Sequence, residues 1–409
     1  MTLRAVDLFS PSASIFRCGT ADFLQKQTNK YQQESTDIIE DQQALNRLVE
    51  RLNTETTLAF DLEADSLHHY TEKVCLIQVS TNSETALIDP LAPLDLSPLA
   101  PILANPAVRK VFHGADYDMR SLYRDFGFEV RNLFDTMIAS QFLGEKEVGL
   151  AAALKKRFGV ELDKKYQKAD WSKRPFSPQM IEYAMKDTSL LIKLYLQLED
   201  ELRAKGRLAW VEEESEIVSC VRAASRDNEP LFLRFKGAAK LKPRSLAVLE
   251  KLLLFRDERA RKRDVPPFRI LGNEPLRELA ELLPRTAADL TGIPGISQKL
   301  IDTYGREILN VVAQGLSIPA EKLPHYPTVQ RVIKDRYQEE RLKRLKEWRE
   351  GKGAALGLSV GIIANNSLLE ALSEAAPDSL EKLAGIPGLK RWQKQEFGAE
   401  LLDLLKNVS

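Results

Sequence analysis

The sequence predicts an α/β domain with a mixed sheet, followed by an all-helical region. Between residues 57 and 113, short runs of β-branched and apolar residues alternate with turn residues, which is typical of strands. Strand runs first and alternating helices afterwards favour a mixed sheet covered by helices. Beyond about residue 206 the strand pattern ends, and helical segments separated by short Pro and Gly breaks follow.

The expected elements follow in chain order. The expected strands are Thr57–Leu62, Val74–Ser80, Thr85–Asp89 and Lys110–His113. We expect helices at Asp116–Phe126 and in the long segments after Asp135 and Ser177. The expected domains are a variable N-terminal extension without clear period (1–36), the α/β domain (37–205), a helical linker (206–239), a first helical domain (240–318), a Pro-rich linker (319–329) and a second helical domain (330–409).

Two helical domains are expected because this region contains an internal repeat. A shift of 93 residues places Leu290–Gly295 on Leu383–Gly388 without a gap, and Arg256 on Arg349. The repeated Leu-x-Gly-Ile-Pro-Gly element forces a tight turn, after which a helix starts with exposed backbone N–H groups. Such groups can bind phosphate without reading a base. A turn selected for helix packing alone explains the element equally well.

Composition excludes several classes of protein. The chain is 44% hydrophobic, yet it has no apolar run of the roughly 18–20 residues that a membrane span requires. The polar N-terminus, with Arg4 and Asp7, indicates no signal peptide. The 3 cysteines are far apart, which argues against a disulfide framework or a thiolate zinc site and favours a cytoplasmic location.

The net charge of zero, from 59 basic and 59 acidic residues, gives no support to a nucleic-acid partner at first sight. The charge is unevenly divided, however. Residues 1–205 hold 25 basic and 30 acidic side chains, whereas residues 206–409 hold 34 and 29. Between Arg234 and Arg269 there are 12 basic and 4 acidic side chains. This gradient indicates two tasks, although solvated helix faces would also produce it.

Three short segments carry acidic residues at the ends of expected elements. Asp61 and Glu63 are two residues apart at a strand end, so they share a face beside the core. Two like charges there are costly unless a divalent cation with oxygen ligands, such as Mg²⁺ or Mn²⁺, neutralises them. Two acids on a solvent-facing strand end are the alternative.

The other two acidic segments are expected on helices. Asp116 fits the first turn of a helix, and Asp118 lies two residues further along, where it could point toward the strand end. Tyr183 and Asp187 are four residues apart, which stacks them on one helix face beside core leucines. Acids that only stabilise a helix end, and a Tyr–Asp pair at the surface, are the alternatives.

Together and in this order, the segments resemble the DEDD superfamily of 3′–5′ exonucleases, in the branch with Tyr four residues before the last Asp, and within it the ribonuclease D family. The repeated units resemble the HRDC domain, and the second departs more from the pattern, with Lys390 where the first has Ser297. The resemblance covers roughly residues 40–205 and both repeats. The segments that carry it are Phe60–Glu63, Val74–Ser80, Val111–Asp118, Leu133–Thr136, Ala169–Pro175 and Tyr183–Asp187.

The resemblance implies an RNase H-like exonuclease domain followed by two HRDC domains. It implies that two divalent cations, Mg²⁺ or Mn²⁺, are bound by Asp61, Glu63, Asp118 and Asp187, with Tyr183 as a further catalytic residue that orients the attacking water. Asp135, at an expected helix start, is interpreted as structural. As candidate substrate contacts we name Leu62, Trp171, Lys173 and Arg174, although Trp171, Lys173 and Arg174 could equally pack their own loop.

The implied activity is removal of nucleoside 5′-monophosphates from RNA 3′ ends, with tRNA precursors or other structured RNAs as partners and a monomer favoured. Two alternatives stay open. One is a DNA exonuclease of the same chemistry, because the cations act on phosphate oxygens common to RNA and DNA. The other is a non-catalytic nucleic-acid-binding protein in which the acids are structural.

Overall fold

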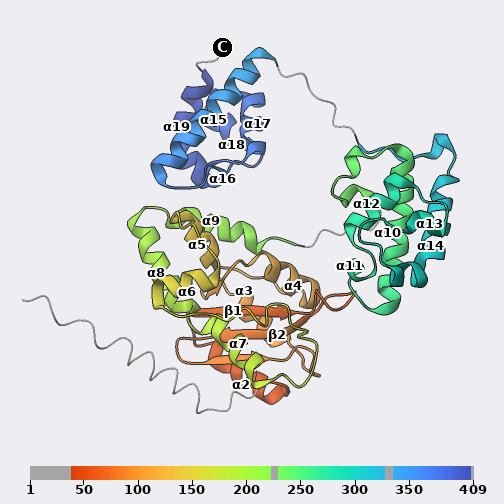
Figure 1. Ribbon diagram of the computed structural model, residues 1–409. Helices are drawn as coiled ribbons and strands as arrows, with labels where there is room; N and C mark the ends of the chain where they lie inside the picture. The colour runs from red at the N-terminus through yellow and green to blue at the C-terminus, as the bar shows by residue number, and fades with distance from the viewer. Residues whose placement is uncertain (1–37, 223–228, 328–334, 407–409) are drawn as a thin grey trace, which may run out of the picture. The chain divides into compact units, whose positions relative to one another are not determined.

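The computed structural model describes residues 38–222, 229–327 and 335–406 (Figure 1). It confirms the expected fold class, because five strands form one mixed sheet and every later element is helical. The expected N-terminal extension, residues 1–36, lies outside the described residues. None of the helices in the described ranges has the length and apolar character required to cross a membrane.

The sheet has the strand order β3-β2-β1-β4-β5. Its strands are β1 (Thr57–Ala64), β2 (Val74–Ser80), β3 (Thr85–Ile88), β4 (Arg109–Phe112) and β5 (Leu133–Asp135). The central strand β1 is antiparallel to β2 and parallel to β4. The four expected strands are confirmed, whereas β5 was not predicted, because three residues are too short to show a period of two.

Helices cover both faces of this sheet. They are α2 (Gln42–Leu52), α3 (Ala100–Ala104), α4 (Asp116–Phe126), α5 (Thr136–Phe142), α6 (Leu150–Phe158), α7 (Pro178–Ser189), α8 (Leu191–Ala204) and α9 (Leu208–Ser219). The expected helix starts after Asp135 and Ser177 are confirmed, because both side chains accept hydrogen bonds from the first turn of the helix that follows.

Alternation along β1 decides which side chains face which helices. Leu58, Phe60 and Leu62 belong to a buried cluster that also contains residues of α2, α3 and α4. Ala59 belongs to the cluster that contains residues of α5, α8 and α9. Since successive side chains of a strand point to opposite faces, the face that carries Ala59 also carries Asp61 and Glu63, and α7 packs against β1, β2 and β3.

The internal repeat is reproduced in the helices. The first unit contains α10 (Pro243–Arg263), α11 (Pro267–Ile270), α12 (Asn273–Leu282), α13 (Ala287–Leu290) and α14 (Gln298–Leu316). The second contains α15 (Arg336–Leu356), α16 (Val360–Ile363), α17 (Asn366–Ala375), α18 (Leu380–Ala384) and α19 (Arg391–Lys406). Every helix of the second unit begins 93 residues after its counterpart.

The repeated arginine has the same task in both units. Arg256 donates to the carbonyl of Leu271 (3.3 Å) and to Asn273 Oδ1 (2.8 Å). Arg349 donates to the corresponding carbonyl of Ala364 (3.0 Å) and to Asn366 Oδ1 (2.8 Å). In both units an arginine of the first helix is therefore hydrogen-bonded to the start of the third helix.

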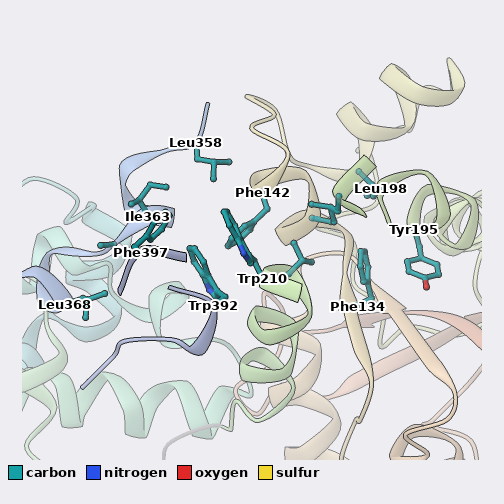
Figure 2. Close-up of a cluster of buried hydrophobic side chains, with 14 of the residues drawn as sticks. Phe134, Phe142, Tyr195, Leu198, Trp210, Leu358, Ile363, Leu368, Trp392 and Phe397 are labelled. Atoms are coloured by element: carbon teal, nitrogen blue, oxygen red, sulfur yellow. The ribbon is translucent and has the colours of Figure 1, made fainter. Parts of the chain in front are cut away.

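Helix α9 lies in the segment that was expected to be a linker, but it packs against β5 and α5. Its Trp210 stacks on Trp392 of α19, with ring centroids 4.6 Å apart and planes inclined by 21°. Phe142 and Phe397 meet this pair edge-on. Figure 2 shows these rings in one buried cluster with side chains from α5, α9 and α19. Helix α9 is therefore part of a hydrophobic core.

Candidate active site

Three carboxylates converge where β1 meets α7. Asp61 and Glu63 come from β1, and Asp187 comes from α7. One ligand oxygen from each lies within 4.8 Å of the others. Asp187 is buried, while Asp61 and Glu63 are half-buried. The structure thus brings together three of the four acids that the sequence predicted as cation ligands.

A capped start and a buried hydrogen bond to the sheet help to fix helix α7 in place. The Ser177 side chain accepts a hydrogen bond from the backbone of Met180, and Pro178 occupies the first helical position. The Ser80 hydroxyl of β2 donates to the hydroxyl of Thr188 at 2.7 Å. Thr188 directly follows Asp187, so this buried contact ties the helix to the sheet beside the carboxylates.

The fourth acid, Asp118, lies in the first turn of α4 and is only 6% exposed. It is not one of the three acids whose oxygens meet within 4.8 Å, but burial and then Asp61 raise its pKa. Asp116 is exposed and pairs with Arg120 at 2.8 Å. Of the two acids in this turn, the structure therefore places Asp118 toward the carboxylate cluster.

Asp135 holds the turn that carries Asp118. Its carboxylate accepts hydrogen bonds from Gly114 N (2.9 Å) and Ala115 N (2.8 Å), just before α4. It also accepts from Met137 N (2.8 Å) and Ile138 N (3.3 Å) at the start of α5. Gly114 has φ +75°, a conformation that favours glycine. The interpretation of Asp135 as a structural residue is confirmed.

Tyr183 lies one turn before Asp187 on α7. Its ring packs against Trp171 and Tyr166, with centroids 6.1 and 5.8 Å away. Burial, and then the charges of Asp187, Glu63 and Asp61, raise the pKa of its hydroxyl far above the ordinary value. The phenol therefore stays protonated beside the carboxylates at physiological pH and can hydrogen-bond a water molecule.

The cluster is electrostatically unfavourable without a cation. Burial raises the pKa of Asp61 to about 7. Burial, followed by repulsion from Asp61, raises the pKa of Asp187 to about 8. Burial and the charges of Asp61, Asp187 and Asp118 raise the pKa of Glu63 to about 10. Since oxygen donors and excess negative charge suit hard divalent cations, these residues fit the expected metal site.

Three of the four candidate substrate contacts are engaged within the protein, and the fourth is exposed. Leu62 is 7% exposed and faces the core on the opposite side of β1 from Asp61. Trp171 is 1% exposed, and its indole N–H donates to the carbonyl of Tyr166. Arg174 binds the Asp89 carboxylate through two hydrogen bonds of 2.5 and 2.6 Å. Only the Lys173 side chain, 78% exposed, extends into solvent.

A pocket of about 180 Å³ beside Tyr183 contains residues that the sequence analysis did not single out. Tyr166, Lys165 and Lys186 line it, and the Lys165 ammonium lies 5.3 Å from the Tyr166 ring centroid. Lys186 pairs with Glu182 at 2.7 Å, whereas an aromatic ring beside a cationic side chain, as in Tyr166 and Lys165, is a common arrangement for binding a base and its phosphate. The run Lys164-Lys165-Tyr166, two basic residues followed by an aromatic one, is the sequence pattern that could have indicated this surface.

The two Ile-Pro-Gly turns lead into helices that are capped differently. Helix α14 is capped by its own Ser297, whose side chain accepts from Leu300 N. At the start of α19, Arg391 N and Trp392 N instead donate to the Glu213 carboxylate at 2.7 and 2.8 Å. Lys390, the residue that departs from the repeat, binds Glu214 at 2.5 Å. In the second unit a protein carboxylate thus occupies the position predicted for phosphate.

Known proteins are similar to this chain in both its α/β part and its helical part. A family model described as "3'-5' exonuclease" matches residues 36–203, and a model of the HRDC domain matches residues 245–312 and 338–405. The chain is 32% identical to ribonuclease D of Acidiphilium cryptum over 371 residues, 90% of this chain and 92% of that one. Ribonuclease D of Sphingobium indicum is 30% identical over 374 residues, 90% and 94% of the two chains.

Two solved structures are similar as well. Escherichia coli RNase D, described as an exoribonuclease involved in structured RNA processing, matches with a TM-score of 0.68 at 25% identity, covering 91% of this chain and 99% of that one. The catalytic core of RRP6 from Trypanosoma brucei matches with a TM-score of 0.58 at 31% identity, covering 68% and 79%. The chain belongs to the ribonuclease D family and is a 3′–5′ exoribonuclease with C-terminal HRDC domains.

Proposed function

We propose that this exoribonuclease binds two divalent cations, Mg²⁺ or Mn²⁺, through Asp61, Glu63, Asp118 and Asp187, and trims the 3′ ends of structured RNAs such as tRNA precursors. The observation that carries the metal site is the convergence of three partly buried carboxylate oxygens within 4.8 Å. The RNA assignment is supported by the relatives, including one described as acting in structured RNA processing.

In this proposal the four carboxylates bind the cations and Tyr183 positions the attacking water. When bound, the cations would lower the pKa of a water molecule and neutralise charge on the scissile phosphate. Asp61, Glu63 and Asp187 would hold them, and Asp118 would complete the set from α4. The neutral hydroxyl of Tyr183 would hold the attacking water in line with the scissile bond. Such positioning by a hydrogen bond requires no covalent enzyme intermediate.

We assign RNA binding to the first HRDC unit rather than to the second. Several arginines of its basic stretch act within the protein; Arg244, for example, donates to the carbonyl of Leu316 at 3.0 Å. Lys236, Lys240 and Lys242 are exposed ahead of α10 and are available to phosphates. The start of α19, in contrast, is occupied by Glu213.

We also propose a cytoplasmic location and a monomeric protein. Cys75 and Cys220 are free thiols, which is the usual state of cysteine in a reducing compartment.

The substrate assignment predicts faster degradation of RNA than of DNA. Purified protein would be incubated with 3′-labelled RNA or DNA of matched sequence, with Mg²⁺, Mn²⁺ or EDTA. We expect label release as nucleoside 5′-monophosphate from RNA in the presence of either cation, and none in EDTA. Faster release from DNA would contradict the RNA assignment, and activity in EDTA would contradict the metal site.

The substitution Tyr183→Phe is expected to lower turnover about tenfold or more and to leave RNA affinity nearly unchanged. It removes the hydroxyl that holds the water but keeps the ring that packs on Trp171, and misplacement of a reactant can lower the rate by on the order of 10²-fold. Single-turnover rates and RNA binding in Ca²⁺ separate the two effects. Tyr326→Phe, which removes a hydroxyl that donates to the carbonyl of Leu233 outside the exonuclease domain, is the control and should retain full turnover.

A further inference from the structure

Gln78 is a buried polar side chain that lacks partners. It lies in the middle of β2 and is 0% exposed. Among the residues that the structure describes, neither its amide nitrogen nor its amide oxygen has a hydrogen-bond partner. A buried amide without partners destabilises a folded protein, so retaining one requires a reason.

A second buried glutamine shows the usual arrangement. Gln393 of α19 is 4% exposed. Its amide nitrogen donates to the carbonyl of Ile363 at 2.9 Å, and its amide oxygen accepts from Lys390 N at 3.0 Å. Both polar ends are thus satisfied inside the protein, which is what Gln78 lacks.

The strand register places Gln78 beside the carboxylate cluster. Gln78 and Asp61 are direct partners across the antiparallel pair of β2 and β1. Its neighbours Ile77 and Val79 belong to the cluster on the opposite face. Ser80, two residues further along β2, bonds Thr188 of α7. Side chains of direct partners share a face and have Cβ atoms about 4.5–5.5 Å apart, so the Gln78 amide is within reach of the Asp61 carboxylate.

We propose that Gln78 is a positioning residue, whose amide N–H group donates to the Asp61 carboxylate when that carboxylate binds a divalent cation. This inference rests on the proposed metal site. Partners that hydrogen-bond to a metal ligand fix its orientation, and their loss usually weakens metal binding. A neutral amide suits this position, because a cationic donor would repel the metal and a further carboxylate would add to the existing repulsion.

The test combines stability and metal affinity in the substitution Gln78→Met, which keeps the approximate volume and removes both polar atoms. In EDTA we expect the thermal midpoint to rise by about 2–4 °C, because an unpaired buried amide is removed. Affinity for Mn²⁺, measured by calorimetry without RNA, is expected to fall about tenfold or more. Gln78→Leu should change both quantities in the same directions, so the result does not depend on one variant folding.

Gln393→Met is the matched control. It removes an amide whose two ends are paired, so we expect a lower thermal midpoint and unchanged Mn²⁺ affinity. Unchanged Mn²⁺ affinity in both Gln78 variants would overturn the role of Gln78 but not the proposed metal site. A lower thermal midpoint of these variants in EDTA would also overturn that role, because the amide would then have a partner in the metal-free protein. Absence of Mn²⁺ binding by the unmodified protein would overturn the proposed metal site as well.

Discussion

Replacing Asp61 with asparagine is expected to reduce turnover of RNA about 10³-fold or more, because bound cations supply several kcal/mol of transition-state stabilisation. Ligand oxygens of Glu63 and Asp187 both lie within 4.8 Å of the Asp61 carboxylate, and its charge also acts on Asp118. Asparagine keeps the shape of the side chain but loses an anionic oxygen. Release of nucleotide from 3′-labelled RNA at saturating Mg²⁺ measures the effect.

The same substitution is expected to stabilise the cation-free protein. Burial raises the pKa of Asp61 to about 7, so at pH 8 its ionised form costs folding free energy, and each unit of pKa shift corresponds to about 1.4 kcal/mol. We therefore expect Asp61→Asn to raise the free energy of unfolding in EDTA by at least about 1 kcal/mol. If Asp61→Asn lost activity because it misfolded, its free energy of unfolding would be lower than that of the unmodified protein.

Asp116→Asn is the matched control for Asp61→Asn. Asp116 is exposed on α4 and pairs with Arg120. An exposed pair of this kind contributes little to stability, so both turnover and unfolding should stay near the values of the unmodified protein. If Asp61→Asn kept its turnover, the proposed metal site would be wrong.

Local rules explain why much of the site could be predicted from the sequence. A period of two placed Asp61 and Glu63 on one face of β1, and a spacing of four placed Tyr183 and Asp187 on one face of α7. The shift of 93 residues predicted a second helical unit, and every helix of that unit begins 93 residues after its counterpart. Each of these inferences needs only residues that are near in the chain, or a comparison of the chain with itself.

Contacts between distant segments explain what could not be predicted. Arg174 binds Asp89 across 85 residues, so a side chain that was a candidate for substrate contact is engaged within the protein. Arg391 N meets Glu213 across 178 residues, and the apparent linker helix α9 enters a core for the same reason. Gln78 shows the same limit, because neither its burial nor its lack of partners is visible in the run Val74–Ser80.

The stability of the cation-free protein is expected to fall as pH rises from about 5 to 9. The folded-state pKa values of Asp61 (about 7), Asp187 (about 8) and Glu63 (about 10) all lie above the ordinary values of 3.8 to 4.5. A raised pKa means that the folded state binds more protons than the unfolded state. The stabilising contribution of each carboxyl group is therefore complete below about pH 4 and is lost as pH rises through the folded-state pKa of that group.

Urea unfolding in EDTA at pH 5.5, 7.0 and 8.5 measures this loss, which should amount to several kcal/mol over the range. Addition of Mg²⁺ should restore most of it at pH 8.5 and little at pH 5.5, because cations bind the ionised carboxylates and compete with protons. Asp61→Asn should flatten the dependence by removing one titrating group. If stability in EDTA were constant or rose with pH, the pKa values of these carboxylates would not be raised in the folded protein. If the effect of Mg²⁺ on stability were independent of pH, the cations would bind elsewhere.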